Sequence, residues 1–127
     1  MEEIVDTNII LRFLVGDNKF QYKKAVGLFK EAQKYKRKLL LKSVVIAEAC
    51  FVLESFYKKE RNEIAEKLEI FLSQRWLKVE ERETMLNLWI WYRKNLHFVD
   101  SYLLSWAKVN NGKILSFDKK LLNKLKE

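Results

Sequence analysis

The sequence predicts an α/β domain, a three-layer α/β/α sandwich around a short central parallel β-sheet. Two observations carry this prediction. Short apolar runs that are too brief for helices alternate along the chain with segments whose apolar residues recur every three or four positions. The 127 residues are 49% hydrophobic and 13% aromatic, which is enough to bury one core. Strands separated by helical segments need crossover connections, so we expect a parallel sheet covered by helices and a single domain over residues 1–127.

Each element can be justified from its own residues. The expected strands are residues 3–5, 39–41, 77–79 and 113–116. The turn-forming residues Asn110, Asn111 and Gly112 directly precede the last of them. Amphipathic helices are expected where apolar residues keep helical spacing, in residues 25–32, 64–72 and 85–92. A further helix over residues 44–53 is apolar on nearly every face.

Several features indicate a cytoplasmic protein. No apolar stretch approaches the roughly 20 residues that a membrane-spanning helix needs. The chain begins Met-Glu-Glu rather than with a basic region before an apolar one, so we expect no secretory signal. The only cysteine, Cys50, has no intrachain disulfide partner, which fits a reducing compartment.

The net charge of +8 is concentrated in residues 19–42, with a smaller basic excess in residues 108–127. Clustered lysine and arginine attract phosphate backbones by charge and by counterion release, so nucleic acid is the first partner to consider. The alternative is a solvated lysine-rich helix face without a ligand. Charge alone does not separate the two.

Four carboxylates occupy unusual places. Asp6 follows the first expected strand and Asp118 comes shortly after the last, so both are expected at the carboxyl edge of the sheet, where α/β folds place their functional crevice. Asp100 lies at the start of an expected helix. Glu48 interrupts the apolar helix over residues 44–53, where a charge has no evident route to solvent and burial is costly unless the carboxylate is paired or bound to a metal.

Each acid also has an ordinary explanation. The three aspartates are typical helix caps, a role that contributes about 1 kcal/mol. Glu48 has no capping role in the middle of a helix, but a buried ion pair with a basic residue such as Arg12 would explain it. If the four acids converge instead, their repulsion must be relieved, and oxygen ligands select Mg²⁺ or Mn²⁺.

The same inventory of residues argues against several other chemistries. His97 is the only histidine and Cys50 the only thiol, so the usual nitrogen and sulfur ligands of zinc are missing. No Gly-x-Ser-x-Gly motif supports a serine hydrolase. Neither a dinucleotide-binding nor a phosphate-loop motif is present.

Four segments together resemble the acidic motifs of the PIN-domain family, and most of all its small VapC-type toxins of toxin–antitoxin pairs. The segments are residues 4–12, 45–48, 98–104 and 114–120. The resemblance implies a PIN-like fold and a ribonuclease in which one or two Mg²⁺ or Mn²⁺ ions activate the attacking water. The acids matched to the metal-binding and catalytic quartet are Asp6, Glu48, Asp100 and Asp118.

The resemblance extends to neighbouring polar residues. Thr7, Asn8 and Ser116 match positions that orient the metal ligands or the scissile phosphate. After the third acid the family often has small residues, whereas here these positions include Tyr102, Ser105 and Trp106, which affects packing or groove shape. The lysines expected to guide the RNA backbone toward the acids are Lys113, Lys119 and Lys120, together with those of residues 19–42.

Proteins of this kind are usually inhibited by a cognate antitoxin and commonly form homodimers, so the resemblance implies both partners besides RNA. Two other readings stay open. One is a catalytically inert PIN-like module that binds RNA or protein. The other is a different Mg²⁺-dependent phosphatase or phosphotransferase, although Asn8 occupies the place of the second aspartate in the Asp-x-Asp arrangement of such enzymes.

Overall fold

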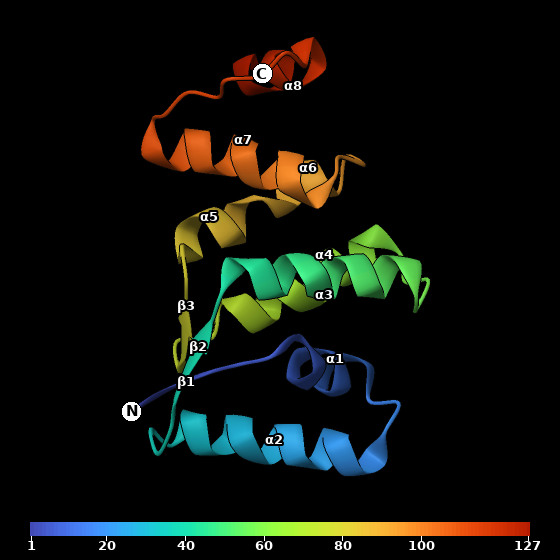
Figure 1. Cartoon of the computed structure of the whole chain (residues 1–127), viewed down its shortest axis with the longest axis vertical. Coiled ribbons are helices and arrows are strands. Elements are labelled where there is room, and N and C mark those ends of the chain that lie inside the picture. Colours follow the sequence, from blue (N-terminus) through green and yellow to red (C-terminus); the bar gives the residue numbers. More distant parts are fainter.

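Three short parallel strands form the sheet in a computed structural model that describes residues 1–127 (Figure 1). The strands are β1 (Glu2–Ile4), β2 (Lys38–Leu41) and β3 (Leu77–Val79). The helices are α1 (Thr7–Val15), α2 (Lys19–Gln33), α3 (Ser43–Ser55), α4 (Arg61–Leu72), α5 (Arg82–Asn87), α6 (Trp89–Tyr92), α7 (Phe98–Asn110) and α8 (Lys119–Lys126). None of these helices is long and apolar enough to cross a membrane.

The strands lie side by side in the order β1-β2-β3, and all pairs are parallel. Helices α1 and α2 connect β1 to β2, and helices α3 and α4 connect β2 to β3, as the crossover argument requires. The predicted α/β sandwich with a short parallel sheet is therefore confirmed. The fourth predicted strand is wrong: residues 113–116 form no strand, because they lie away from any strand edge that would accept their backbone hydrogen bonds.

One core joins the sheet to helices α1 to α6. The side chains at positions 39 and 41 of β2 are buried, as expected for the central strand. The helical stripes predicted over residues 25–32 and 64–72 face this core from α2 and α4. The stripe over residues 85–92 is also buried, but it is divided between the short helices α5 and α6. Helical periodicity thus predicted the buried faces correctly, whereas it did not predict this break.

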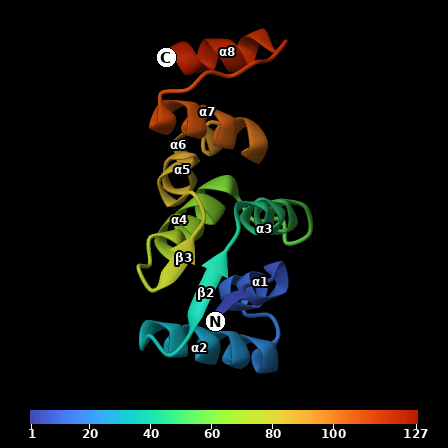
Figure 2. The same cartoon turned by 60° about the vertical axis from the view of Figure 1, so that its left-hand side comes forward.

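The elements are stacked along the long axis of the molecule. Helix α2 lies at one end and helix α8 at the other, with the sheet near α2 and the α5–α7 group between the sheet and α8 (Figure 1). A second view, turned by 60°, gives the same order (Figure 2). The C-terminal segment after α7 is therefore remote from the sheet.

Arg82, at the start of α5, ties this helix to the preceding strand and helix. Its guanidinium donates hydrogen bonds to the carbonyl oxygens of Leu72 at 2.6 Å, Gln74 at 3.0 Å and Leu77. Burial, and then the charge of Arg75, lowers the pKa of Arg82 below its ordinary value, but the three bonds keep the charged form in place.

Replacing Arg82 by methionine is expected to lower the free energy of unfolding by about 1.5–3 kcal/mol, because three carbonyl groups lose a charged donor while the apolar stem is retained. Urea unfolding monitored by circular dichroism measures this. Arg75→Met is the matched control, since Arg75 is exposed and makes no side-chain hydrogen bond. Equal stability of the two variants would contradict the role given to Arg82.

Candidate active site

The first predicted acid lies where expected, at the carboxyl end of a strand. β1 ends at Ile4, and the backbone N–H of Val5 continues the pairing by donating to Leu40 at 3.0 Å. Asp6 then turns the chain with extended backbone angles (φ −80°, ψ 156°) into helix α1. Its carboxylate is exposed and caps nothing, because it accepts no hydrogen bond from the helix. The capping explanation therefore does not account for Asp6.

Glu48 corrects a sequence-based expectation. The helix over residues 44–53 is apolar on most faces, yet the face carrying Glu48 is not covered, and its side chain is exposed. Val44 and Phe51 on the same helix are also exposed, at 73% and 68%. The suggested ion pair with Arg12 is absent, since Arg12 binds Asp17 at 3.1 Å instead. Glu48 is thus a free carboxylate on an apolar, solvent-facing surface of α3.

The third and fourth acids share a cavity of about 250 Å³ between the beginnings of α7 and α8. Asp100 lies in the first turn of α7, where a negative charge is favoured by the helix dipole. Asp118 precedes α8, and both carboxylates line the cavity with Lys120 and Lys124. Two acids with two cations around one small hollow suit a site for a divalent cation and a phosphate group.

Asp118 is also a helix cap, as its ordinary explanation predicted. One carboxylate oxygen accepts hydrogen bonds from the backbone N–H groups of Lys120 at 3.0 Å and Leu121 at 3.2 Å. The hydroxyl of Ser116 accepts a bond from the backbone N–H of Asp118 at 2.9 Å. Ser116 therefore fixes the turn that presents Asp118, which is the kind of orienting role that its motif position implied.

The other predicted residues vary in exposure. Thr7 is buried beside Asp6, whereas Asn8 is exposed and lines a separate cavity between α1 and α2 with Arg12 and Lys24. The lysines predicted to bind the RNA backbone, Lys113, Lys119 and Lys120, are all exposed near α8. The basic helix α2 lies at the opposite end of the molecule (Figure 1). One chain therefore presents two separate basic regions.

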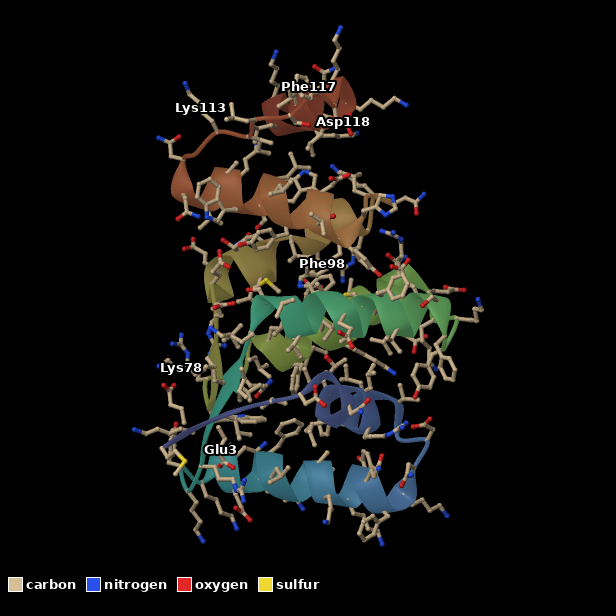
Figure 3. The ribbon with its side chains drawn as sticks, viewed as in Figure 1. Glu3, Lys78, Phe98, Lys113, Phe117 and Asp118 are labelled. Carbon is tan, nitrogen blue, oxygen red and sulfur yellow. The ribbon has the colours of Figure 1, made fainter.

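The four acids do not form a complete set of metal ligands in this structure. No group of three or more potential metal-ligating side chains is present within reach of one ion. Asp118 lies near Phe117 at the α8 end of the molecule (Figure 3). The oxygen-only donor set has the chemistry that Mg²⁺ or Mn²⁺ needs, but in one chain only Asp100 and Asp118 share a cavity.

Two further acids at the carboxyl edge of the sheet were missed by the sequence reasoning. Glu80 directly follows β3 and accepts hydrogen bonds from the backbone N–H of Ser43 at 3.0 Å and from Lys42 at 2.9 Å. These two donors lower the pKa of Glu80 below its ordinary value. Glu80 thereby caps the start of α3, the helix that carries Glu48. The rule that pointed to Asp6, an acid directly after a strand, would have found it.

Glu81 is the hydrogen-bond partner of Tyr102, one of the large residues that follow the third acid, Asp100. The hydroxyl of Tyr102 donates to the Glu81 carboxylate at 2.7 Å, and burial together with this carboxylate raises the pKa of Tyr102 to about 12. One turn later, the buried hydroxyl of Ser105 donates to the carbonyl of Thr84 at 2.7 Å. Both bonds fasten α7 to the α5 region. The residues that depart from the family pattern therefore position the helix that carries Asp100.

A model of the PIN-domain family matches residues 4–127, almost the whole chain. The chain belongs to the PIN-domain family. PIN domains have a nuclease-type fold and generally use divalent metal ions, so the family matches the donor chemistry of the four acids. No curated protein and no solved structure matches the chain.

Proposed function

We propose that this PIN domain is a metal-dependent endoribonuclease. The observation that carries the proposal is the cavity where Asp100 and Asp118 face Lys120 and Lys124, in a chain that matches the family model over residues 4–127. Carboxylates provide the ligands that Mg²⁺ and Mn²⁺ prefer, and the neighbouring ammonium groups attract a phosphate that the acids alone would repel. RNA is accordingly the proposed substrate.

The four acids Asp6, Glu48, Asp100 and Asp118 are the proposed ligands of one or two Mg²⁺ or Mn²⁺ ions. When bound, such an ion supplies a water of lowered pKa and stabilises negative charge on the phosphate. The chain's own contributions are geometric: Ser116 holds the turn before Asp118, and Glu80 holds the start of the Glu48 helix. Thr7 and Asn8, which follow Asp6, are proposed to orient its carboxylate or the phosphate.

The narrower biological role follows from the motif resemblance alone. We place the protein with the VapC-type toxins, cytoplasmic ribonucleases that a cognate antitoxin inhibits. Exposed apolar side chains on α3 offer a surface for such a partner, because Val44 and Phe51 flank Glu48. An adjacent gene for a small antitoxin would support this role, and the absence of one would weigh against it.

The separation of the acids gives a second candidate function a specific basis. A PIN-like module that binds RNA without cleaving it needs the basic regions but not an assembled metal site. The basic regions lie at both ends of the molecule, and no three of the acids are within reach of one ion. Cleavage, rather than binding, therefore distinguishes the two functions.

The deciding experiment is cleavage of a mixed-sequence RNA with single-stranded loops, using protein shown by mass spectrometry to be free of a co-purified antitoxin. We expect cleavage with Mg²⁺ or Mn²⁺ and none with EDTA, because no histidine pair is available for metal-free chemistry. A small phosphomonoester assayed in parallel tests the phosphatase alternative and is expected to stay intact. RNA binding without metal-dependent cleavage would favour the inert module.

A further inference from the structure

A cavity of about 650 Å³ opens at the amino ends of the strands. Its lining comes mainly from the start of β1, the turn into β2, the turn into β3 and β3 itself. Because the strands are parallel, this edge of the sheet is opposite the one that carries Asp6 and Glu80. Lys78, which lines the cavity, lies apart from Asp118 at the α8 end (Figure 3). None of the four proposed metal ligands belongs to this cavity.

The cavity is strongly basic. Its charged lining residues are Glu2, Arg37, Lys38, Arg75, Lys78 and Arg82. Two of the cations are compensated by acids. Lys78 pairs with Glu2 at 2.8 Å. Arg37 pairs with Glu31 at 2.7 Å and with Glu3 at 2.9 Å. The other three cations have no such partner.

The three uncompensated cations are Lys38, Arg75 and Arg82. Lys38 and Arg75 are exposed and form neither an ion pair nor a side-chain hydrogen bond, since Glu2, opposite Lys38 in the strand register, is bound to Lys78. Arg82 binds only backbone carbonyls, which leaves its charge uncompensated. The pKa of Arg82 is lowered by burial and then by the charge of Arg75, as expected where like charges lie close together. A hollow lined by charge of one sign attracts an anion.

Two aromatic side chains, Tyr35 and Trp76, also line the cavity. Trp76 is fixed, because its ring packs against Phe29 at 5.8 Å between centroids and its indole N–H donates to the Gln74 side chain at 3.2 Å. Tyr35 is 81% exposed and has a left-handed backbone (φ 59°) just after α2. That conformation favours glycine or asparagine, so a tyrosine there is strained. Strain of this kind is typical of functional sites.

Positive charge continues beyond the cavity along the turn between α2 and β2. Residues 34–38 read Lys-Tyr-Lys-Arg-Lys, and Lys34 and Lys36, on either side of Tyr35, are exposed. A single free nucleotide needs no charge outside the cavity, whereas a polynucleotide carries a phosphate at every unit. Cations interleaved with an exposed aromatic ring are typical of surfaces that bind single strands, where the backbone follows the cations and the bases stack. The chemistry therefore favours a single-stranded polynucleotide.

We propose that this cavity binds one nucleotide of a single-stranded RNA, with the phosphate on Lys38 and Arg75 and the base stacked on Tyr35. It is a second RNA contact, at the opposite edge of the sheet from Asp6. The choice of RNA rests on the proposed function, whereas binding at the cavity does not depend on cleavage. The site also assigns a specific contact to Lys38, one of the many lysines of residues 19–42.

The phosphate contacts are tested by fluorescence anisotropy of a labelled single-stranded RNA of about 12 nucleotides, titrated with the whole protein in EDTA to prevent metal-dependent cleavage. We expect the double variant Lys38→Gln with Arg75→Gln to bind about tenfold more weakly. The slope of log affinity against log salt should fall by about 1.4, because each phosphate contact contributes about 0.7. The matched control is Lys58→Gln with Lys94→Gln, which removes two exposed, unpaired cations outside the cavity. An equal loss in both double variants would overturn the proposal.

The stacking contact is tested with Tyr35→Asn, which removes the ring but keeps a residue that tolerates the left-handed backbone. We expect binding to weaken by about 5- to 150-fold with the salt slope unchanged, because a stacked base is lost and no charge is. The control is Phe56→Asn, which removes another exposed ring, 73% accessible and outside the cavity. Circular dichroism checks that both variants are folded. Wild-type affinity in Tyr35→Asn would contradict the site.

Competition separates RNA from a free nucleotide as the source of the ligand. Unlabelled RNA should displace the labelled strand at a far lower concentration than uridine monophosphate does, because only the strand also reaches the cations outside the cavity. Equal potency of the two competitors would overturn RNA as the ligand. Cleavage by the wild type with Mn²⁺ is measured separately. Binding at the cavity without cleavage would refute the ribonuclease and leave the site standing, whereas cleavage with equal RNA binding by all variants would do the reverse.

Discussion

Asp6→Asn is expected to lower kcat/KM for metal-dependent RNA cleavage by about 100- to 1000-fold, and Asp100→Asn by a similar factor. A metal ligand contributes several kcal/mol of transition-state stabilisation, and each 1.36 kcal/mol is about tenfold in rate. Asparagine keeps the size of the side chain but removes the charge that holds the cation. Single-turnover cleavage of a loop-containing RNA at fixed Mn²⁺ measures the loss.

We expect both aspartate variants to lose cleavage activity while they stay folded. The Asp6 carboxylate is exposed and accepts no capping hydrogen bond, so its replacement removes no contact within the chain. Asp100 loses only a favourable first-turn charge, worth about 0.3–1 kcal/mol. The matched control is Glu66→Gln, which removes one exposed, unpaired carboxylate from α4 and should leave cleavage unchanged. Normal turnover by either aspartate variant would refute its role as a metal ligand.

Trp89→Ala is expected to lower the free energy of unfolding by about 3–5 kcal/mol, a large part of the 5–15 kcal/mol typical of a domain. Trp89 is fully buried on α6 and packs edge-to-face with Tyr92 at 5.3 Å between ring centroids. Its indole Nε1 has no hydrogen-bond partner, so the substitution leaves a cavity without breaking a polar contact. Denaturant unfolding followed by circular dichroism, a signal that survives loss of the tryptophan, gives the value.

Ile90→Ala is the control for Trp89, because the next residue of the same helix is 53% exposed and its truncation should change stability by at most about 0.5 kcal/mol. Trp89 also contacts Phe98, the first residue of α7, at 6.0 Å between ring centroids. The cavity therefore lies directly beneath the helix that carries Asp100. If the two variants were equally stable, the α5–α7 group would not be part of the cooperative core.

Helix α7 carries Asp100, a proposed metal ligand, and is fixed by contacts to the α5 region. Tyr102 and Ser105 fasten it to the α5 region, and Phe98 packs on Trp89. This attachment holds Asp100 in place, but it also directs the following residues 113–118 away from their own sheet (Figure 3). The contacts that position Asp100 therefore also set where the chain leaves α7.

Local features of the chain were readable from the sequence. Apolar residues at helical spacing predicted the buried faces of α2 and α4. An apolar stripe on one side of a helix is buried against whichever element packs there, so the stripe alone identifies the buried face. The first three strands were predicted close to their observed bounds from short apolar runs between helices. An aspartate before a helix predicted the cap of α8, since that hydrogen bond forms within three residues.

Non-local features were decided by the tertiary structure. An apolar helix sequence does not show which face lacks a neighbour, so Glu48 was expected to be buried and is exposed. The segment over residues 113–116 has the pattern of a strand, but a strand exists only where an edge is within reach, and α7 directs this segment away from β1. The sequence by itself determined the family, the helices, three strands and the four acids. Only the tertiary structure decided that Asp100 and Asp118 share a cavity and that no three of the acids are within reach of one ion, because these distances depend on packing between residues far apart in sequence.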